Sequence, residues 1–217
     1  MSLEFLDLKP GPKRGRPKGT TKGGMTHALT PAQQDALFAA ARARGIRDEF
    51  FLKLVYTLAL RCKEAIELRL DDFNDKTKEV LVRAVKGGTH RHYLLFAELW
   101  ALYKLWMKER AETTPASNPW LFPHRVRRAD DRLTSEGAKS LFYTVAKAAG
   151  IKGHSIHSLR HSIATDMALA GDSQLVIARH LRHKSVQSSA RYISTVDDGA
   201  HQAVLNARLQ RRWGRPR

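Results

Sequence analysis

Cysteine occurs once in the 217 residues, at Cys62, so the chain can form neither an internal disulfide nor a metal cage of several cysteines. No apolar run approaches the roughly 18 residues that a membrane-spanning helix requires. The N-terminus also has no basic stretch followed by an apolar one. These absences predict a protein of a reducing compartment that is neither secreted nor inserted into a membrane.

Acidic residues are in the minority, because 21 Asp and Glu stand against 38 Lys and Arg, for a formal net charge of +17. A positive field of this size attracts polyanions, and nucleic acid is the partner that it predicts. The alternative is a solvated basic surface without such a partner. The expected location is the cytoplasm, in association with the nucleoid.

The N-terminal residues 1–29 are expected to form a disordered basic arm. Residues 9–22 contain no acid and interleave Lys and Arg with Pro and Gly, so this stretch cannot bury apolar surface. Its centre resembles the AT-hook, an extended motif that lies in a narrow A·T minor groove, where Arg is favoured. The DNA contacts would come from Lys13, Arg14, Arg16 and Lys18. A solvated linker or a non-specific phosphate-binding tail is the alternative.

Residues 30–196 have the patterns of an ordered, mostly helical domain. Thr30, Pro31 and Gln33 form a capping-box start, and Gly45 is the matching stop. Further helices are expected at 50–58, 63–68, 98–112, 135–149, 158–170, 173–181 and 186–192, with 115–132 irregular. On the helix at 98–112 we expect Leu99, Leu102, Leu105 and Trp106 to share the core face. Strands are expected at 79–86 and 90–95, around a turn at Gly87 and Gly88 that places Lys86 at a hairpin tip. The fold class is therefore mainly α or α+β.

Several side chains suited to phosphodiester chemistry lie near the C-terminus. His157, Arg160 and His161 form one group, and His183 and Tyr192 follow. A phenol, imidazoles and a guanidinium, joined by Arg61 and Lys86 upstream, are what cleavage without a metal through a phosphotyrosine requires. His157 and Arg160 stand at a predicted helix start, where free backbone N–H groups favour an anion. A second His-x-x-Arg, at His124 and Arg127, lies in a predicted loop and is not expected to act.

A metal site is the competing interpretation of the histidines. His157 and His161, or His180 and His183, have helical spacing suitable for zinc. However, arginines stand among them and no acidic ligand accompanies them, so we expect neither a metal nor another cofactor. His161 is then expected to be structural.

Together these residues resemble the tyrosine recombinase (phage integrase) family over about residues 30–196. The run from Leu60 to Glu64 resembles its first-arginine motif, and Lys86 before two glycines resembles its β-hairpin lysine. The run from His157 to His161 resembles its His-x-x-Arg box, His183 its further histidine and Tyr192 its nucleophile. The resemblance implies a helical catalytic domain with a small three-stranded antiparallel sheet.

The resemblance also implies a reaction. Tyr192 would attack a scissile phosphate in double-stranded DNA and form a 3′-phosphotyrosyl bond, while Arg61 and Arg160 stabilise the growing negative charge. His157 or His183 would assist Tyr192, and Lys86 would protonate the leaving 5′-oxygen. A 5′-hydroxyl from another strand could then reseal the break, which is site-specific recombination. The expected assembly on DNA is a homotetramer, whereas the protein without DNA can be a monomer in solution.

The chain departs from the family pattern at several points. Ala59 and Arg182 replace glycines that usually precede the first arginine motif and the later histidine. Residues 1–29 are too few for a separate core-binding domain, so the chain resembles compact members such as fimbrial phase-switch recombinases. The arm would partly replace the missing clamp. Residues 197–217 are expected to form a basic helix or tail that docks on a neighbouring copy or folds back on its own domain.

Two other functions remain open on the sequence alone. One is a non-catalytic DNA-binding or regulatory protein with the same fold. The other is an enzyme like the type IB topoisomerases, which use phosphotyrosine chemistry to relax supercoils.

Overall fold

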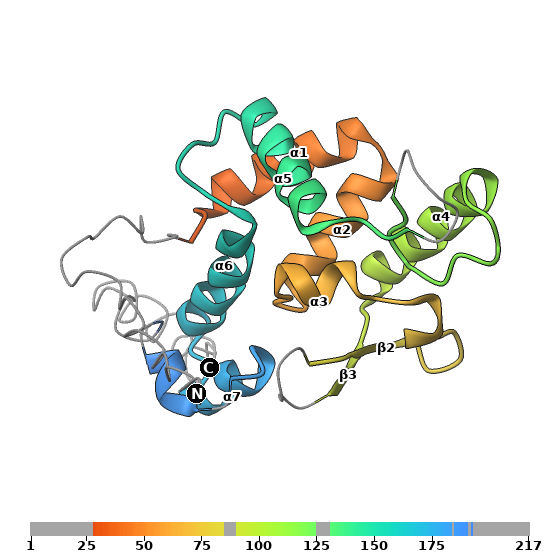
Figure 1. Ribbon diagram of the computed structural model, residues 1–217. Helices are drawn as coiled ribbons and strands as arrows, with labels where there is room; N and C mark the ends of the chain where they lie inside the picture. The colour runs from red at the N-terminus through yellow and green to blue at the C-terminus, as the bar shows by residue number, and fades with distance from the viewer. Residues whose placement is uncertain (1–27, 85–89, 125–130, 184, 191, 193–217) are drawn as a thin grey trace, which may run out of the picture.

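The computed structural model describes residues 28–84, 90–124, 131–183, 185–190 and 192, and within them the chain is mainly helical with one small antiparallel sheet (Figure 1). The α-helices are α1 (Pro31–Arg44), α2 (Ile46–Thr57), α3 (Cys62–Ile66), α4 (Ala97–Thr113), α5 (Ser135–Ala148), α6 (Ile156–Leu169) and α7 (Gln174–His180). Short 3₁₀ helices lie at η1 (Leu70–Asp72) and η2 (Val186–Ser189), and the strands are β1 (Phe73–Asn74), β2 (Glu79–Val82) and β3 (Arg91–Leu94). The predicted fold class is confirmed. Lys86, the basic arm and residues 197–217 lie outside the described residues.

The start of α1 is the one that the sequence predicts. The Thr30 hydroxyl accepts a hydrogen bond from the Gln33 backbone N–H, and the Gln33 side chain accepts one from the Thr30 N–H. These two bonds satisfy N–H groups that no helical carbonyl can reach. Gly45 ends α1 with a φ of 129°, in the region that favours glycine, so α2 can begin at once in a new direction.

Helix α2 is the central element of the fold, and it packs against α1, α4 and α6 (Figure 1). Its Phe50, Phe51 and Leu54 side chains are fully buried. The predicted face of α4 needs one correction, because Leu99 and Trp106 are buried whereas Leu105 is 51% exposed. At about 100° per residue, position 105 lies about 240° from position 99, which turns it to solvent.

The sheet has the strand order β1-β2-β3, with Val80 of β2 opposite Tyr93 of β3. Strand β2 ends at Val82, earlier than the predicted 79–86, and Lys86 and the predicted turn lie outside the described residues. The sheet contacts the end of α7, because the Tyr93 hydroxyl donates to the His180 carbonyl at 2.8 Å. This contact links the hairpin to the segment that carries His183.

Helix α6 is fixed against the N-terminal helices by polar contacts. The Leu29 N–H donates to the Ser162 hydroxyl at 2.8 Å, and Asp166 accepts from Gln34 at 3.0 Å and from the Tyr56 hydroxyl at 2.6 Å. These bonds hold the helix that carries three of the histidine and arginine residues singled out in the sequence. Among the described residues, no helix combines the length and apolar character needed to cross a membrane.

Candidate active site

Arg61 stands in the break between α2 and α3, as the sequence predicts. Ala59 turns the chain there with a φ of 48°, and Arg61 is the residue that precedes the first turn of α3. Its backbone N–H donates to Glu64 Oε2 at 2.9 Å and its side chain donates to Glu64 Oε1 at 2.6 Å. The Arg61 side chain keeps 39% of its surface exposed, whereas that of Glu64 is fully buried. Glu64 therefore holds Arg61 at its backbone N–H and at one terminal nitrogen of its guanidinium, while part of the Arg61 side chain stays exposed.

Arg160 lies one turn into α6 and reaches the same break. Its two terminal nitrogens donate to the backbone carbonyls of Ala59 and Leu181. The residue is 6% exposed, so the guanidinium is held by the backbone on both sides. A guanidinium has five N–H donors, and these two bonds use two of them. The Arg160 guanidinium therefore has N–H donors left with which to bind an anion beside Arg61 while both carbonyl contacts persist.

The pKa values of Arg160 and His157 both reflect how close these cations lie. Burial, followed by the charges of Arg61 and Arg182, lowers the pKa of Arg160 to about 10, and nearby Glu64 and Tyr192 partly offset this. Arg160 still carries its charge at neutral pH. Burial, followed by the charges of Arg160, Lys139 and Arg61, lowers the pKa of His157 below its ordinary value. The lowered pKa keeps His157 neutral, and the two arginines beside it make it a weaker proton acceptor than a free imidazole.

Tyr192 lies within a small apolar cluster formed by α6, α7 and the α2–α3 break. Its ring packs with Ala164, Ala168, Ile177 and Leu181 and is 5% exposed. The Tyr192 hydroxyl lies 2.9 Å from His161 Nδ1. The sequence predicts a structural role for His161, yet this residue is in hydrogen-bond contact with the candidate nucleophile. Its position beside Arg160 is a signal in the sequence, but spacing alone does not say which imidazole meets the phenol.

His183 borders the same tyrosine from the segment after α7. Its ring stacks on that of Tyr192 with centroids 6.5 Å apart and planes inclined by 19°. Its Nδ1 lies 2.8 Å from the Ser189 hydroxyl, which belongs to η2. The sequence predicts a helix around 186–192 here, and the structure has a 3₁₀ turn over Val186–Ser189 followed by helical residues at Ala190 and Tyr192. His183 therefore lies beside the tyrosine with its ring nearly parallel to that of Tyr192.

Two histidines with lowered pKa values near this site predict a stability that falls in acid. Burial lowers the pKa of both His157 and His180, so the folded state holds them neutral to a lower pH than the unfolded chain does. As the pH falls below about 6.5, these histidines become protonated in the unfolded state but remain neutral in the folded state. The free energy of unfolding therefore decreases. We expect His180→Gln, which keeps a donor toward the Thr57 carbonyl 2.9 Å away, to reduce this drop in urea unfolding between about pH 7.5 and 5.5. His92→Gln, at an exposed histidine, is the control. If the free energy of unfolding has the same pH dependence in the unmodified protein, His180→Gln and His92→Gln, the assignment is contradicted.

The structure thus brings together five of the six predicted catalytic residues. Arg61, His157 and Arg160 surround the break after α2, and His183 and Tyr192 lie at the other end of the group. Lys86 and the four arm residues lie outside the described part of the chain. Glu64 and His161 are the contacts that sequence reasoning did not assign. Within the ranges that the structure describes, no group of three or more His, Cys, Asp or Glu side chains is arranged to hold a metal.

Comparison with known proteins gives a consistent result. The model of the phage integrase family matches residues 27–198. The tyrosine recombinase XerA of Pyrococcus horikoshii is 28% identical over 167 residues, which cover 77% of this chain and 57% of that protein. XerA of Pyrococcus furiosus is 28% identical over 185 residues, covering 85% and 63%. The chain therefore spans less than two thirds of the length of these relatives.

Solved structures share the fold. The crystal structure of XerA recombinase superposes with a TM-score of 0.67 at 24% identity and covers 88% of this chain and 65% of that one. The XerH site-specific recombinase, bound to its palindromic difH substrate after cleavage, gives 0.69 at 22% identity and covers 85% and 53%.

Proposed function

Because the chain belongs to the phage integrase family, we propose that it is a site-specific DNA recombinase that cleaves and rejoins strands through a 3′-phosphotyrosyl intermediate. The observation that carries the proposal is the meeting of two arginines from distant segments at the α2–α3 break, with a hydrogen-bonded tyrosine next to them. Two fixed guanidiniums are suited to a phosphate, and the phenol is the nucleophile beside the same helix. A net charge of +17 supplies the attraction to DNA.

The proposed cleavage step assigns one task to each group. The Tyr192 oxygen forms a bond to phosphorus as the bond from phosphorus to the 5′-oxygen breaks, and Arg61 and Arg160 stabilise the charge on the non-bridging oxygens. Tyrosine has an ordinary pKa of about 10, so its proton must be accepted as attack proceeds. His161 Nδ1 is the candidate acceptor by contact, since it lies 2.9 Å from the hydroxyl. His157 and His183 remain candidates by position.

The leaving 5′-oxygen needs a proton, and we assign that task to Lys86 as the general acid. The new phosphotyrosyl bond retains the energy of the phosphodiester, so a 5′-hydroxyl can reverse the step and no other energy source is required. If that hydroxyl comes from a second DNA molecule or segment, the product is recombinant. We further propose a homotetramer on paired sites, with residues 197–217 as the docking segment.

Covalent trapping tests the proposal and identifies the target sequence in the same experiment. The protein is incubated with a pool of duplexes that carry a nick beside a randomised segment, so that the short cleaved fragment diffuses away and the adduct persists. We expect a protein–DNA adduct on denaturing gels, and the sequences recovered from it should converge on one site. Absence of any adduct would favour a non-catalytic DNA-binding protein. Relaxation of supercoiled DNA without strand exchange would favour a topoisomerase.

The basic arm offers a separate prediction about binding. Replacing Lys13, Arg14, Arg16 and Lys18 by alanine should weaken DNA binding and flatten its dependence on salt, because each phosphate contact contributes about −0.9 to the slope of log K against log salt. The slope should fall by up to about 3 to 4, measured by fluorescence anisotropy across a salt series. A variant with the arm residues in shuffled order keeps the charge and is the control. Unchanged affinity and slope in the alanine variant would contradict a role of the arm as a clamp.

A further inference from the structure

Arg182 is a buried cation at a backbone position where a side chain is unusual. Its φ is 55°, in the left-handed region that glycine adopts without strain, and a residue with a Cβ is disfavoured there. The residue is only 8% exposed, so its guanidinium does not lie on the protein surface. A strained backbone and a buried charge both oppose folding, and both persist only where other contacts offset them.

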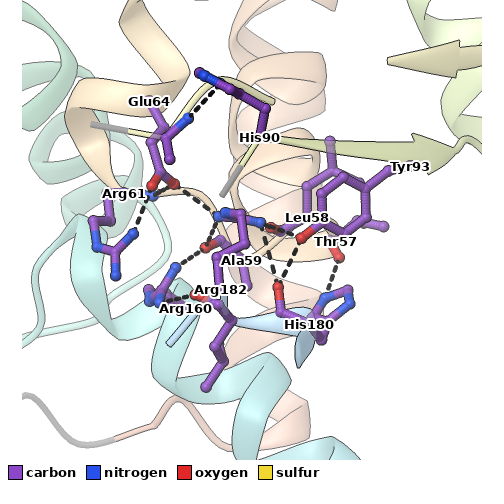
Figure 2. A network of polar contacts seen from close by, with 12 residues as sticks. Thr57, Leu58, Ala59, Arg61, Glu64, His90, Tyr93, Arg160, His180 and Arg182 are labelled. Atoms are coloured by element: carbon purple, nitrogen blue, oxygen red, sulfur yellow. Dashed lines mark hydrogen bonds and ion pairs between the residues drawn. The ribbon is translucent and has the colours of Figure 1, made fainter. Parts of the chain in front are cut away.

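The contacts of Arg182 converge on the partners of both proposed catalytic arginines (Figure 2). One terminal nitrogen donates to Glu64 Oε2 at 2.7 Å and to the Ala59 carbonyl at 2.9 Å. The other donates to the Leu58 carbonyl at 2.9 Å and to the Tyr93 hydroxyl. Figure 2 shows this guanidinium between Glu64, which binds Arg61, and Ala59, whose carbonyl also binds Arg160.

The charge of Arg182 also matters for Glu64. Burial alone would raise the pKa of that carboxyl, but the charge of Arg182, followed by the hydrogen bonds from Arg61 and Arg182, brings it below its ordinary value. Glu64 therefore stays ionised although it is fully buried. An ionised carboxylate can hold two guanidiniums, one on each oxygen, and in the structure it does.

We infer that Arg182 is a positioning residue for cleavage: it fixes Glu64 and the Ala59 carbonyl, and through them sets the places of Arg61 and Arg160. The inference rests on the proposed function, because the two arginines matter as a pair only if a phosphate binds between them. The Tyr93 contact adds the sheet to the same network. The site is thus fixed from the end of α7, from the α2–α3 break and from β3 at once.

The test measures single-turnover cleavage at saturating DNA, on the nicked duplex recovered from the trapping experiment, beside the Kd for that DNA. Arg182→Gly relieves the backbone and removes the guanidinium, and we expect cleavage to slow roughly 10- to 100-fold. The Kd should change less than about 3-fold, since a buried side chain makes no DNA contact. Arg182→Lys keeps the charge but cannot bridge two groups in the same way, so it should recover part of the rate.

A core substitution and a double substitution separate positioning from stability. Val145→Ala weakens the core on α5, where the side chain is fully buried. It should leave the cleavage rate near that of the unmodified protein, whatever its Tm. In a Glu64→Gln background, Arg182→Gly should cost a smaller factor than it does alone, because the two residues act through one contact.

Different outcomes overturn the positioning role and the proposed function. If the unmodified protein forms an adduct and Arg182→Gly cleaves at the same rate, the positioning role is overturned. The positioning role is also overturned if the cleavage rates of Arg182→Gly and Val145→Ala both decrease in proportion to the decrease in their Tm. If the unmodified protein forms no adduct, the proposed function itself fails, and the positioning role fails with it.

Discussion

Tyr192→Phe should abolish the covalent adduct, with cleavage reduced by about 10⁴-fold or more, because the phenol oxygen is the atom that bonds to phosphorus. The substitution removes one hydroxyl and keeps the ring, which fills the cluster between α6 and α7. The protein should therefore fold, and the loss of the hydrogen bond to His161 should cost only about 0.5–1.5 kcal/mol. DNA binding should be nearly unchanged, so this variant should lose the adduct while its Kd for DNA stays the same. The measurement is the adduct band on a denaturing gel, beside anisotropy binding.

Tyr143→Phe is the matched control for this experiment. Tyr143 lies on α5 and is 54% exposed, so the same chemical change there should leave adduct formation intact. An adduct that persists in Tyr192→Phe and maps to a different residue would show that the nucleophile was misassigned. His161→Ala in the same assay asks whether the observed contact assists attack or only holds the tyrosine at rest.

The helices and their ends could be predicted from the sequence because their signals are local. The capping box at Thr30 and the stop at Gly45 each depend on residues a few positions apart, and both are present in the structure. The prediction for Leu105 is wrong because it treats two adjacent positions as one face, although a helix turns about 100° per residue. Strand β1 is only two residues long and carries too little pattern to be detected.

The site could be predicted in composition but not in its connections. Arg61, Arg160 and Tyr192 could be assigned because side chains of the right chemistry occur in the right order. Glu64 and Arg182 could not be linked, since they lie 118 residues apart in sequence and meet only after folding. Local sequence patterns carry no signal for such a pair. The two replaced glycines, at Ala59 and Arg182, are visible in the sequence, and both positions have a positive φ in the structure.

Arg160→Lys should slow cleavage by roughly 10²- to 10³-fold at saturating DNA, the usual cost of losing one fixed donor to a developing oxyanion. The reason lies in geometry, since the charge is kept. Arg160 bridges the Ala59 and Leu181 carbonyls, and its fork has further donors with which to bind a phosphate. A lysine places its three donors on one nitrogen and cannot reach both carbonyls and the phosphate together.

A second buried arginine provides the control for that loss. Arg110 on α4 is 3% exposed and also bridges backbone carbonyls, those of Trp120 and Asn118. Arg110→Lys should therefore lower Tm by an amount comparable to Arg160→Lys, while its cleavage rate stays near that of the unmodified protein. Equal rate losses in the two variants would mean that Arg160 acts only through stability. A loss of cleavage rate confined to Arg160→Lys would identify the Arg160 guanidinium as part of the phosphate site, because both substitutions remove a buried guanidinium but only Arg160 lies at the candidate site.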